Sequence, residues 1–245
     1  MAAARGRSNQ VASLPLPALS LTGATIAFDL DGTLVDTAPD LVGALNCVLC
    51  ERRLSGLPLK TARLMVGRGA RALIEQGFAA AGAPLHPDEA PIMVERFIEI
   101  YAGRLARESR PFAGVEAALD VLASAGAALS VCTNKRTDLS LALLDALGLT
   151  SRFAAIIGAD RTPAPKPDGR HLVTAVEAAG GVIGRAILVG DSASDVAAAR
   201  AAGAPSVVVT FGYTEIAPDA LGGDHLIGHF IELPALAERL LAPRA

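Results

Sequence analysis

The chain has 245 residues, of which 51% are hydrophobic, and a formal net charge of -3 at pH 7. This length and apolar content suffice for one large α/β domain or two smaller ones, with a core that needs neither disulfides nor a structural metal. The negative charge argues against a nucleic-acid binder, and no apolar run approaches the roughly 20 residues of a membrane span.

The N-terminal residues 1–20 are broken by prolines and lack the continuous apolar segment of a signal peptide, so we expect a flexible tail. Cys47, Cys50 and Cys132 are too few for a disulfide framework and fit a reducing compartment, which predicts a cytoplasmic protein. Cys47 and Cys50 form a C-x-x-C without a second pair at zinc-ligand spacing. We therefore expect them to pack within a helix.

The next segment changes from a strand pattern to a helical one. Residues 25–29 are a short β-prone run that ends near the turn dipeptide Asp31-Gly32, which predicts a buried strand. Residues 38–107 instead place apolar side chains three or four positions apart, and glycines and prolines divide them into several helices. We expect these residues to form an inserted helical cap.

From residue 108 onward, short apolar strands alternate with helices. The expected strands are 129–132, 155–157, 187–189, 207–209 and a last one near 226–227, and the expected helices are 115–125, 139–147, 172–179, 196–202 and 233–241. This alternation predicts a doubly wound, Rossmann-like parallel sheet covered by helices on both faces. The expected organisation is an α/β core of residues 21–37 and 108–245, with an all-helical cap domain at 38–107.

Polar residues cluster where the predicted strands end. They are Asp29 and Asp31; Thr133, Asn134 and Lys135; and Asp191, Ser192 and Asp195, with Lys166 in a proline-rich loop. Ligands bind outside the carboxyl ends of the strands of an open parallel sheet, so these groups should converge. Two of the three lysines fall in this set, where a compact ammonium suits a phosphate oxygen. Carboxylates, ammoniums and hydroxyls together favour metal-assisted phosphoryl transfer.

Four segments in order resemble the motifs of the haloacid dehalogenase superfamily. Residues 28–36, FDLDGTLVD, resemble its D-x-D-x-T phosphatase motif, and residues 131–134, VCTN, resemble its second motif. Lys166-Pro167 resembles the third motif, and residues 190–195, GDSASD, resemble the fourth. The resemblance covers the whole chain after the tail and implies a phosphatase with a helical cap.

The resemblance also implies roles for the matching residues. Asp29 would be the nucleophile that forms an acyl-phosphate, and Asp31 the general acid and base. Mg²⁺ would be held by the Asp29 carboxylate, the Asp31 main-chain carbonyl, Asp191 and waters, an oxygen-only set that this ion prefers. Thr133 and Lys166 would bind phosphate oxygens and balance their charge.

Further residues are expected around this centre. Asp195 would orient Lys166 or a metal-bound water, with Ser192 beside it, and Asn134 would contact the substrate. Taken singly, Thr133 and Asp195 are also ordinary residues of helix N-termini. The catalytic interpretation therefore depends on the convergence of the whole set.

Three segments, residues 36–41, 66–70 and 211–214, resemble phosphoglycolate phosphatases. This predicts 2-phosphoglycolate as the substrate, with Arg68 as a contact to its carboxylate; the alternative for Arg68 is a solvated residue of the cap. Asp31 argues against the true dehalogenases of the superfamily, which lack this carboxylate because displacing a halide needs no proton donor.

Other functions stay open at this stage. They are a sugar-phosphate phosphatase, a phosphomutase and a non-catalytic interaction protein with the same fold, although a retired site would be expected to lose part of its catalytic set. The expected partner is a small phosphate ester, without nucleic acid or membrane, and the expected assembly is a monomer or homodimer. Lys135 is left open as a phosphate or substrate contact. The four histidines share no metal-ligand spacing and are expected on the surface or in loops: His86, His171, His225 and His229.

Overall fold

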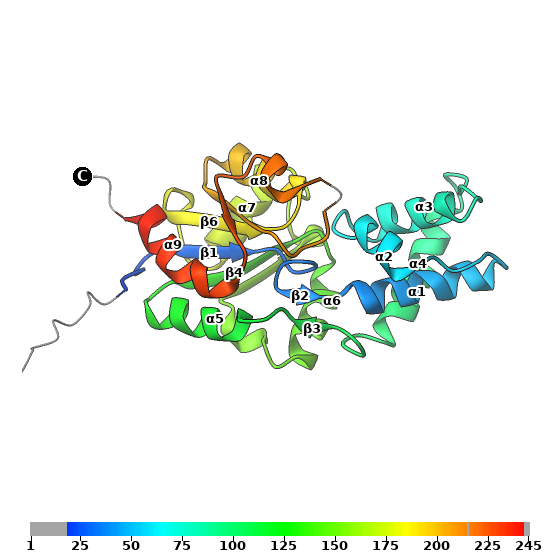
Figure 1. The fold of residues 1–245 in the computed structure, drawn as a ribbon, viewed down its shortest axis with the longest axis horizontal. Helices are drawn as coiled ribbons and strands as arrows, with labels where there is room; N and C mark the ends of the chain where they lie inside the picture. Colours follow the sequence, from blue (N-terminus) through cyan, green and yellow to red (C-terminus); the bar gives the residue numbers. More distant parts are fainter. Residues whose placement is uncertain (1–18, 215, 243–245) are drawn as a thin grey trace, which may run out of the picture.

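The structure is a computed structural model that describes residues 19–214 and 216–242. The expected tail, residues 1–20, lies almost entirely outside the described residues. Figure 1 shows an α/β layer at one end of the molecule and a group of helices at the other. None of the described helices is long and apolar enough to cross a membrane.

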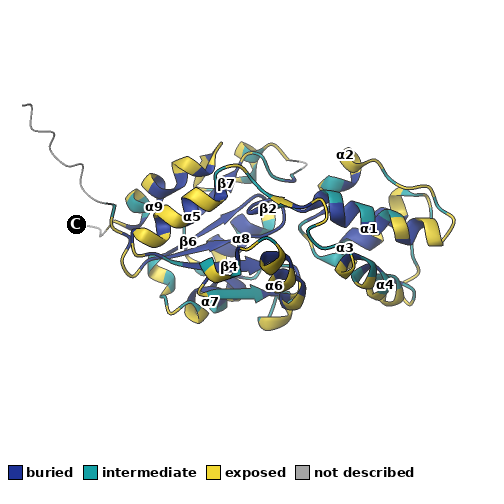
Figure 2. Cartoon of the chain, turned by 90° about the horizontal axis from the view of Figure 1, so that it is seen from below, coloured by how far each residue is buried: buried dark blue, intermediate teal, exposed yellow. Residues whose placement is uncertain are grey.

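Six parallel strands form the central sheet in the order β5-β4-β1-β6-β7-β8. Their bounds are β1 Thr25–Phe28, β4 Ala128–Thr133, β5 Ala155–Gly158, β6 Ala186–Gly190, β7 Ser206–Val209 and β8 His225–Ile227. Phe28 lies between Val131 of β4 and Val189 of β6, so these central strands end within two residues of one another. The strands in the middle are nearly continuous buried apolar runs, as a sheet covered on both faces requires (Figure 2).

Five helices accompany this sheet. They are α5 Val115–Ser124, α6 Thr137–Ala146, α7 Gly169–Ala178, α8 Ala193–Ala202 and α9 Leu233–Leu241. Successive side chains of a strand point to opposite faces, and β1 follows this rule. Ile26 and Phe28 belong to a cluster with α5 and α9, whereas Ala27 belongs to a cluster with α7 and α8. The doubly wound fold predicted from the sequence is confirmed.

The remaining helices have a hydrophobic core of their own. They are α1 Ala38–Glu51, α2 Leu59–Ala62, α3 Ala70–Ala80 and α4 Ala90–Ala102. Leu45, Ile74, Phe78, Phe97 and Tyr101 are fully buried among them. The group lies apart from the sheet and beyond the end of β1 (Figure 1).

A short antiparallel ribbon joins the two chain segments that lead into and out of the helical group. It pairs β2, Val35–Asp36, with β3, Arg110–Pro111. Beside it, the buried Asp40 Oδ2 accepts hydrogen bonds from the main-chain N–H groups of Glu108 and Ser109, at 2.9 and 2.8 Å, and from the Ser109 hydroxyl at 2.7 Å. The sequence did not predict this ribbon, because two-residue strands carry no periodic pattern.

Two expectations about single residues are wrong. Cys47 and Cys50 are exposed instead of packed, because they fall beside the apolar stripe of α1 that Leu45 and Leu49 form. His171 was expected on the surface or in a loop but is fully buried in α7.

Candidate active site

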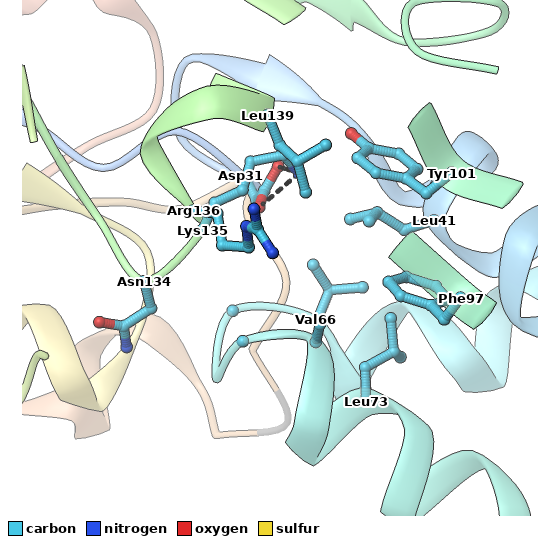
Figure 3. A pocket seen from close by; sticks show the side chains of 13 residues that line it. Asp31, Leu41, Val66, Leu73, Phe97, Tyr101, Asn134, Lys135, Arg136 and Leu139 are labelled. Carbon is cyan, nitrogen blue, oxygen red and sulfur yellow. Dashed lines mark hydrogen bonds and ion pairs between the residues drawn. The ribbon is translucent and has the colours of Figure 1, made fainter. Parts of the chain in front are cut away.

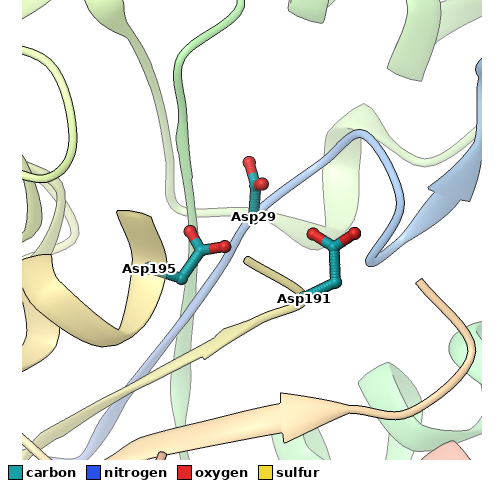
Figure 4. Close-up of side chains that lie close together, drawn as sticks. All are labelled: Asp29, Asp191 and Asp195. Carbon is teal, nitrogen blue, oxygen red and sulfur yellow. The ribbon is translucent and has the colours of Figure 1, made fainter. Parts of the chain in front are cut away.

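Three carboxylates meet beyond the ends of the central strands. Asp29 follows β1, and its main-chain N–H still pairs with the Val189 carbonyl of β6 at 2.8 Å, which fixes its position against the neighbouring strand. Asp191 follows β6, and Asp195 lies in the first turn of α8. Each carboxylate offers an oxygen within 4.8 Å of the others (Figure 4), and all three are buried.

One ammonium lies among these carboxylates. Lys166 Nζ is 2.9 Å from Asp29 Oδ1 and 2.6 Å from Asp195 Oδ1. Burial alone would lower the pKa of Lys166, but Asp195 and Asp29 outweigh it and raise the pKa, so this lysine stays charged. Burial raises the pKa of Asp29 to about 7 against the opposing effect of Lys166. Burial, Asp195 and Asp29 together raise the pKa of Asp191 well above its usual range.

Both oxygens of Asp191 are held in place. Thr33 Oγ1 donates a hydrogen bond to Oδ1 at 3.2 Å, and the Tyr213 N–H donates to Oδ2 at 2.6 Å. The chain passes so near this carboxylate at Gly32 and Gly212 that a Cβ at either glycine would collide with it. Gly32 also has φ of 86°, a left-handed conformation that glycine adopts without strain. Asp191 is thus a preorganised carboxylate rather than a solvated one.

The donor set fits a hard divalent cation. Asp29, Asp191 and Asp195 bring three carboxyl groups within reach of one another, whereas Lys166 supplies one positive charge. Burying unbalanced carboxylates is costly, and a divalent ion bound by oxygens would offset that cost. An acidic cluster of this composition is what a metal-dependent phosphoryl-transfer site requires.

A second group of polar residues lies on the side that faces the helical group. Asp31 is buried, and its two oxygens accept hydrogen bonds from Lys135 Nζ at 3.1 and 3.2 Å. Thr133, at the end of β4, is 1% exposed, and its hydroxyl oxygen accepts from the Lys135 N–H at 3.2 Å. Burial lowers the pKa of Lys135, but Asp31 and Tyr101 together raise it by more, so its charge persists.

The loop that carries Lys166 is fixed through its main chain. Asn134 Nδ2 donates to the Lys166 carbonyl at 3.0 Å, and Asn134 Oδ1 accepts from the Lys166 N–H at 2.9 Å. His171 Nδ1 accepts from the same N–H at 3.2 Å. Asn134 therefore uses both ends of its side chain to position Lys166, and its predicted direct contact with the substrate stays a prediction.

The structure brings most of the predicted site residues together. Ser192 donates from its N–H and its hydroxyl to Asp195 Oδ2, at 3.0 and 2.5 Å, in a capping box that orients Asp195 toward Lys166. Arg68 is the exception, since it is exposed, and its neighbours Gly67 and Gly69 line the nearby cavity in its place.

That cavity lies between the sheet and the helical group (Figure 3). Apolar residues of the helical group form one side, among them Leu41, Val66, Leu73 and Phe97. Asp31 and Lys135 form part of the other side. The space open to water-sized groups measures about 70 Å³. The site is therefore small and apolar on the side away from the carboxylates.

Sequence reasoning missed several residues of the site. Thr33 was visible as the last residue of the D-x-D-x-T motif but was given no role. Tyr213 supports Asp191 through its N–H, while its hydroxyl donates to Asp36 at 2.5 Å. Tyr101 gave no polar signal, because it belongs to the apolar stripe of a helix.

Comparisons with known proteins agree with this geometry. The family profile described as haloacid dehalogenase-like hydrolase matches residues 26–209, so the chain belongs to this family. A phosphoglycolate phosphatase of Caulobacter vibrioides is 59% identical over 221 residues, which are 90% of this chain and 93% of that protein. One of Agrobacterium fabrum is 45% identical over 219 residues, which are 89% of this chain and 94% of that protein. A crystal structure of a predicted phosphoglycolate phosphatase from Haemophilus somnus has a TM-score of 0.80 at 27% identity, covering 89% of this chain and 99% of that one.

Proposed function

We propose that the protein is a Mg²⁺-dependent phosphatase that hydrolyses 2-phosphoglycolate through an aspartyl-phosphate on Asp29. The observation that carries this proposal is the meeting of the buried Asp29 with Lys166 and Asp191 at the ends of the central strands. The substrate is inferred from the phosphoglycolate phosphatase of Caulobacter vibrioides, which is 59% identical to this chain over nearly its whole length.

In the first half of the reaction, an Asp29 carboxylate oxygen attacks phosphorus and the bond from phosphorus to the glycolate oxygen breaks. Asp31 gives a proton to that leaving oxygen, so glycolate departs as an alcohol. Thr133 and Lys166 donate hydrogen bonds to phosphate oxygens as negative charge accumulates there. Asp29 and Asp31 lie two positions apart in the chain, directly beyond the end of β1, where both carboxyl groups can serve one phosphoryl group.

In the second half, Asp31 takes a proton from a water molecule, whose oxygen attacks the phosphorus of the aspartyl-phosphate. The bond between phosphorus and the Asp29 oxygen breaks, and inorganic phosphate leaves. Asp195 keeps Lys166 in place through both steps, because it binds Nζ at 2.6 Å while Ser192 holds its other oxygen.

The residues that would hold Mg²⁺ are Asp29, Asp191 and the main-chain carbonyl of Asp31. When bound, the ion would neutralise phosphate charge and favour attack by one anion on another. The chain supplies the support for this ligand set through Thr33 and the Tyr213 N–H, which fix Asp191.

Several broader features of the protein belong to the same proposal. The cap domain would comprise residues 38–107, and the core residues 21–37 and 108–245. The protein would act in the cytoplasm as a monomer or homodimer, without binding nucleic acid.

The proposal is tested by phosphate release from a panel of small esters, with and without Mg²⁺. The panel contains 2-phosphoglycolate, several sugar phosphates and an alkyl phosphate whose alkyl group carries no charge. Metal-dependent release that strongly favours 2-phosphoglycolate is the expected result. A preference for sugar phosphates would keep the mechanism and overturn the substrate, and no release by folded protein would overturn both.

A further inference from the structure

A hydroxyl in the cavity has no hydrogen-bond partner although it is buried. Tyr101, near the end of α4, is 0% exposed, and its hydroxyl oxygen makes no hydrogen bond within the described residues. The Tyr101 ring lines the cavity with its hydroxyl on the side of Asp31 and Leu139 (Figure 3). A buried hydroxyl without a hydrogen-bond partner costs free energy. Its position at the wall of a cavity therefore points to a ligand that accepts its hydrogen bond.

A buried ammonium lies beside the same ring. Lys135 Nζ is 4.3 Å from the centre of the Tyr101 ring, and its partner within hydrogen-bond distance is the Asp31 carboxylate. An ammonium has three N–H donors, so Lys135 has a donor left for a second acceptor. Burial raises the pKa of Tyr101, which keeps its hydroxyl protonated and able to donate. The two groups together offer a positive charge and a hydroxyl donor.

Other cationic groups near the cavity are less suited to a ligand. Arg136 lines it as well, but its guanidinium forms two hydrogen bonds with Asp138, at 3.1 and 2.7 Å, on the exposed side. Arg68, which the sequence suggested for this purpose, is exposed and does not line the cavity. Lys135 is therefore the buried cation that faces this space.

The size of the cavity limits what can enter. One water needs about 10–15 Å³ of such space, so the cavity's volume of about 70 Å³ corresponds to on the order of five waters. A carboxymethyl group has four heavy atoms and fits, whereas a sugar ring is too large. One side of the cavity is apolar and offers no hydrogen-bond donors from its side chains; it is formed by Leu41, Val66, Leu73 and Phe97. A carboxylate in the cavity would therefore bind on the side of Lys135.

We propose that Lys135 and the Tyr101 hydroxyl form the subsite for the carboxylate of a short acidic substrate. They thereby select this substrate over phosphate esters that lack a carboxylate. This inference rests on the proposed function, because it needs the phosphoryl group bound at Asp29. The substrate carboxylate would share Lys135 with Asp31 and accept the hydroxyl proton of Tyr101. The helical group would then contact the substrate carboxylate through Tyr101.

The test compares two esters that differ only in the group at issue. They are 2-phosphoglycolate and 2-hydroxyethyl phosphate, which has a CH₂OH group in place of the carboxylate. We expect Tyr101→Phe to lower kcat/KM for 2-phosphoglycolate about tenfold or more, mainly through KM, because it loses a hydrogen bond to a charged group. Its effect on 2-hydroxyethyl phosphate should be small. The melting temperature should not fall, because the lost hydroxyl had no partner.

Three further variants make the test specific. Lys135→Met should reduce the preference for 2-phosphoglycolate further than Tyr101→Phe, and Lys60→Met, at an exposed lysine of α2, should leave it unchanged. If Arg68→Met rather than Tyr101→Phe removes the preference, the carboxylate lies at Arg68 and the inference is wrong. It is equally wrong if Tyr101→Phe affects both esters alike or neither. If wild-type protein hydrolyses neither ester, the proposed function fails and the inference fails with it.

Discussion

At the scale of single residues, the hydroxyl of Thr33 is the clearest support for the metal site. It donates a hydrogen bond to Asp191 Oδ1 at 3.2 Å. Among the described residues, no main-chain N–H donates to this oxygen, so its orientation depends on Thr33. Replacing a residue that orients a ligand typically weakens metal binding by about 10–100-fold. We predict that Thr33→Val raises the Mg²⁺ concentration for half-maximal activity by about this factor.

Titrating Mg²⁺ against phosphate release measures this directly. Thr61→Val is the matched control, because Thr61 is exposed on α2 and should leave the requirement unchanged. An unaltered Mg²⁺ requirement in Thr33→Val would show that Asp191 needs no such support.

His171 links the site to the pH of the solution. Its Nδ1 accepts from the Lys166 N–H, and its Nε2 faces the Ile157 carbonyl at 3.2 Å, so the ring fits its place only when neutral. Burial, together with the charge of nearby Lys166, lowers the pKa of His171 to about 4, although the Ile157 carbonyl and Asp195 act in the opposite direction. Between pH 6.5 and 4 the unfolded chain therefore binds a proton that the folded protein excludes.

Stability should consequently fall as the pH decreases through this window. The shift from 6.5 to about 4 corresponds to about 3 kcal/mol of unfolding free energy. We predict that wild-type protein loses about this much more than His171→Gln between pH 7 and 4, measured by urea unfolding. His86→Gln, at an exposed histidine, should follow the wild type. Parallel curves for wild type and His171→Gln would contradict the prediction.

At the scale of elements, the connection into the helical group depends on Asp40. This buried carboxylate accepts three hydrogen bonds from Glu108 and Ser109, which lead back toward the sheet. Removing it leaves buried donors without partners, each at a cost of about 1–3 kcal/mol. We predict that Asp40→Ala lowers the unfolding free energy by at least about 2 kcal/mol.

Chemical denaturation of Asp40→Ala and Asp88→Ala provides the comparison. The Asp88 side chain is 90% exposed, so its removal should change stability little. Equal stability of the two variants would mean that the β2–β3 ribbon stabilises the connection to the helical group without Asp40.

The same scale shows why most of the fold was predictable. The strands of the six-stranded sheet are short apolar runs bounded by turns. The ends of each strand predicted for this sheet agree with those in the structure to within a residue or two. The β2–β3 ribbon was not predictable, because its pairing brings together residues 35–36 and 110–111, which lie far apart in the chain. Local pattern predicts elements, whereas such pairings are set by the folded chain as a whole.

At the scale of the whole molecule, the site exists only where segments distant in sequence meet. Asp29, Lys166 and Asp191 could be predicted because each follows a strand or lies in a motif that resembles a family. Tyr101 and His171 could not, because an apolar helix pattern conceals a polar atom until its surroundings are known. Arg68 was predicted from its charge and from the resemblance of residues 66–70 to phosphoglycolate phosphatases, and the structure leaves it exposed.

The central claim is that phosphate passes through a covalent bond to Asp29. The most direct test is to mix excess protein and Mg²⁺ with 2-phosphoglycolate, quench in acid, and reduce with borohydride, which converts an aspartyl-phosphate to homoserine. Mass spectrometry of the peptide that contains residue 29 should show homoserine in wild-type protein and none in Asp29→Asn, which should also lose turnover. An unmodified Asp29 during active turnover, or an Asp29→Asn variant that still releases phosphate, would contradict the account.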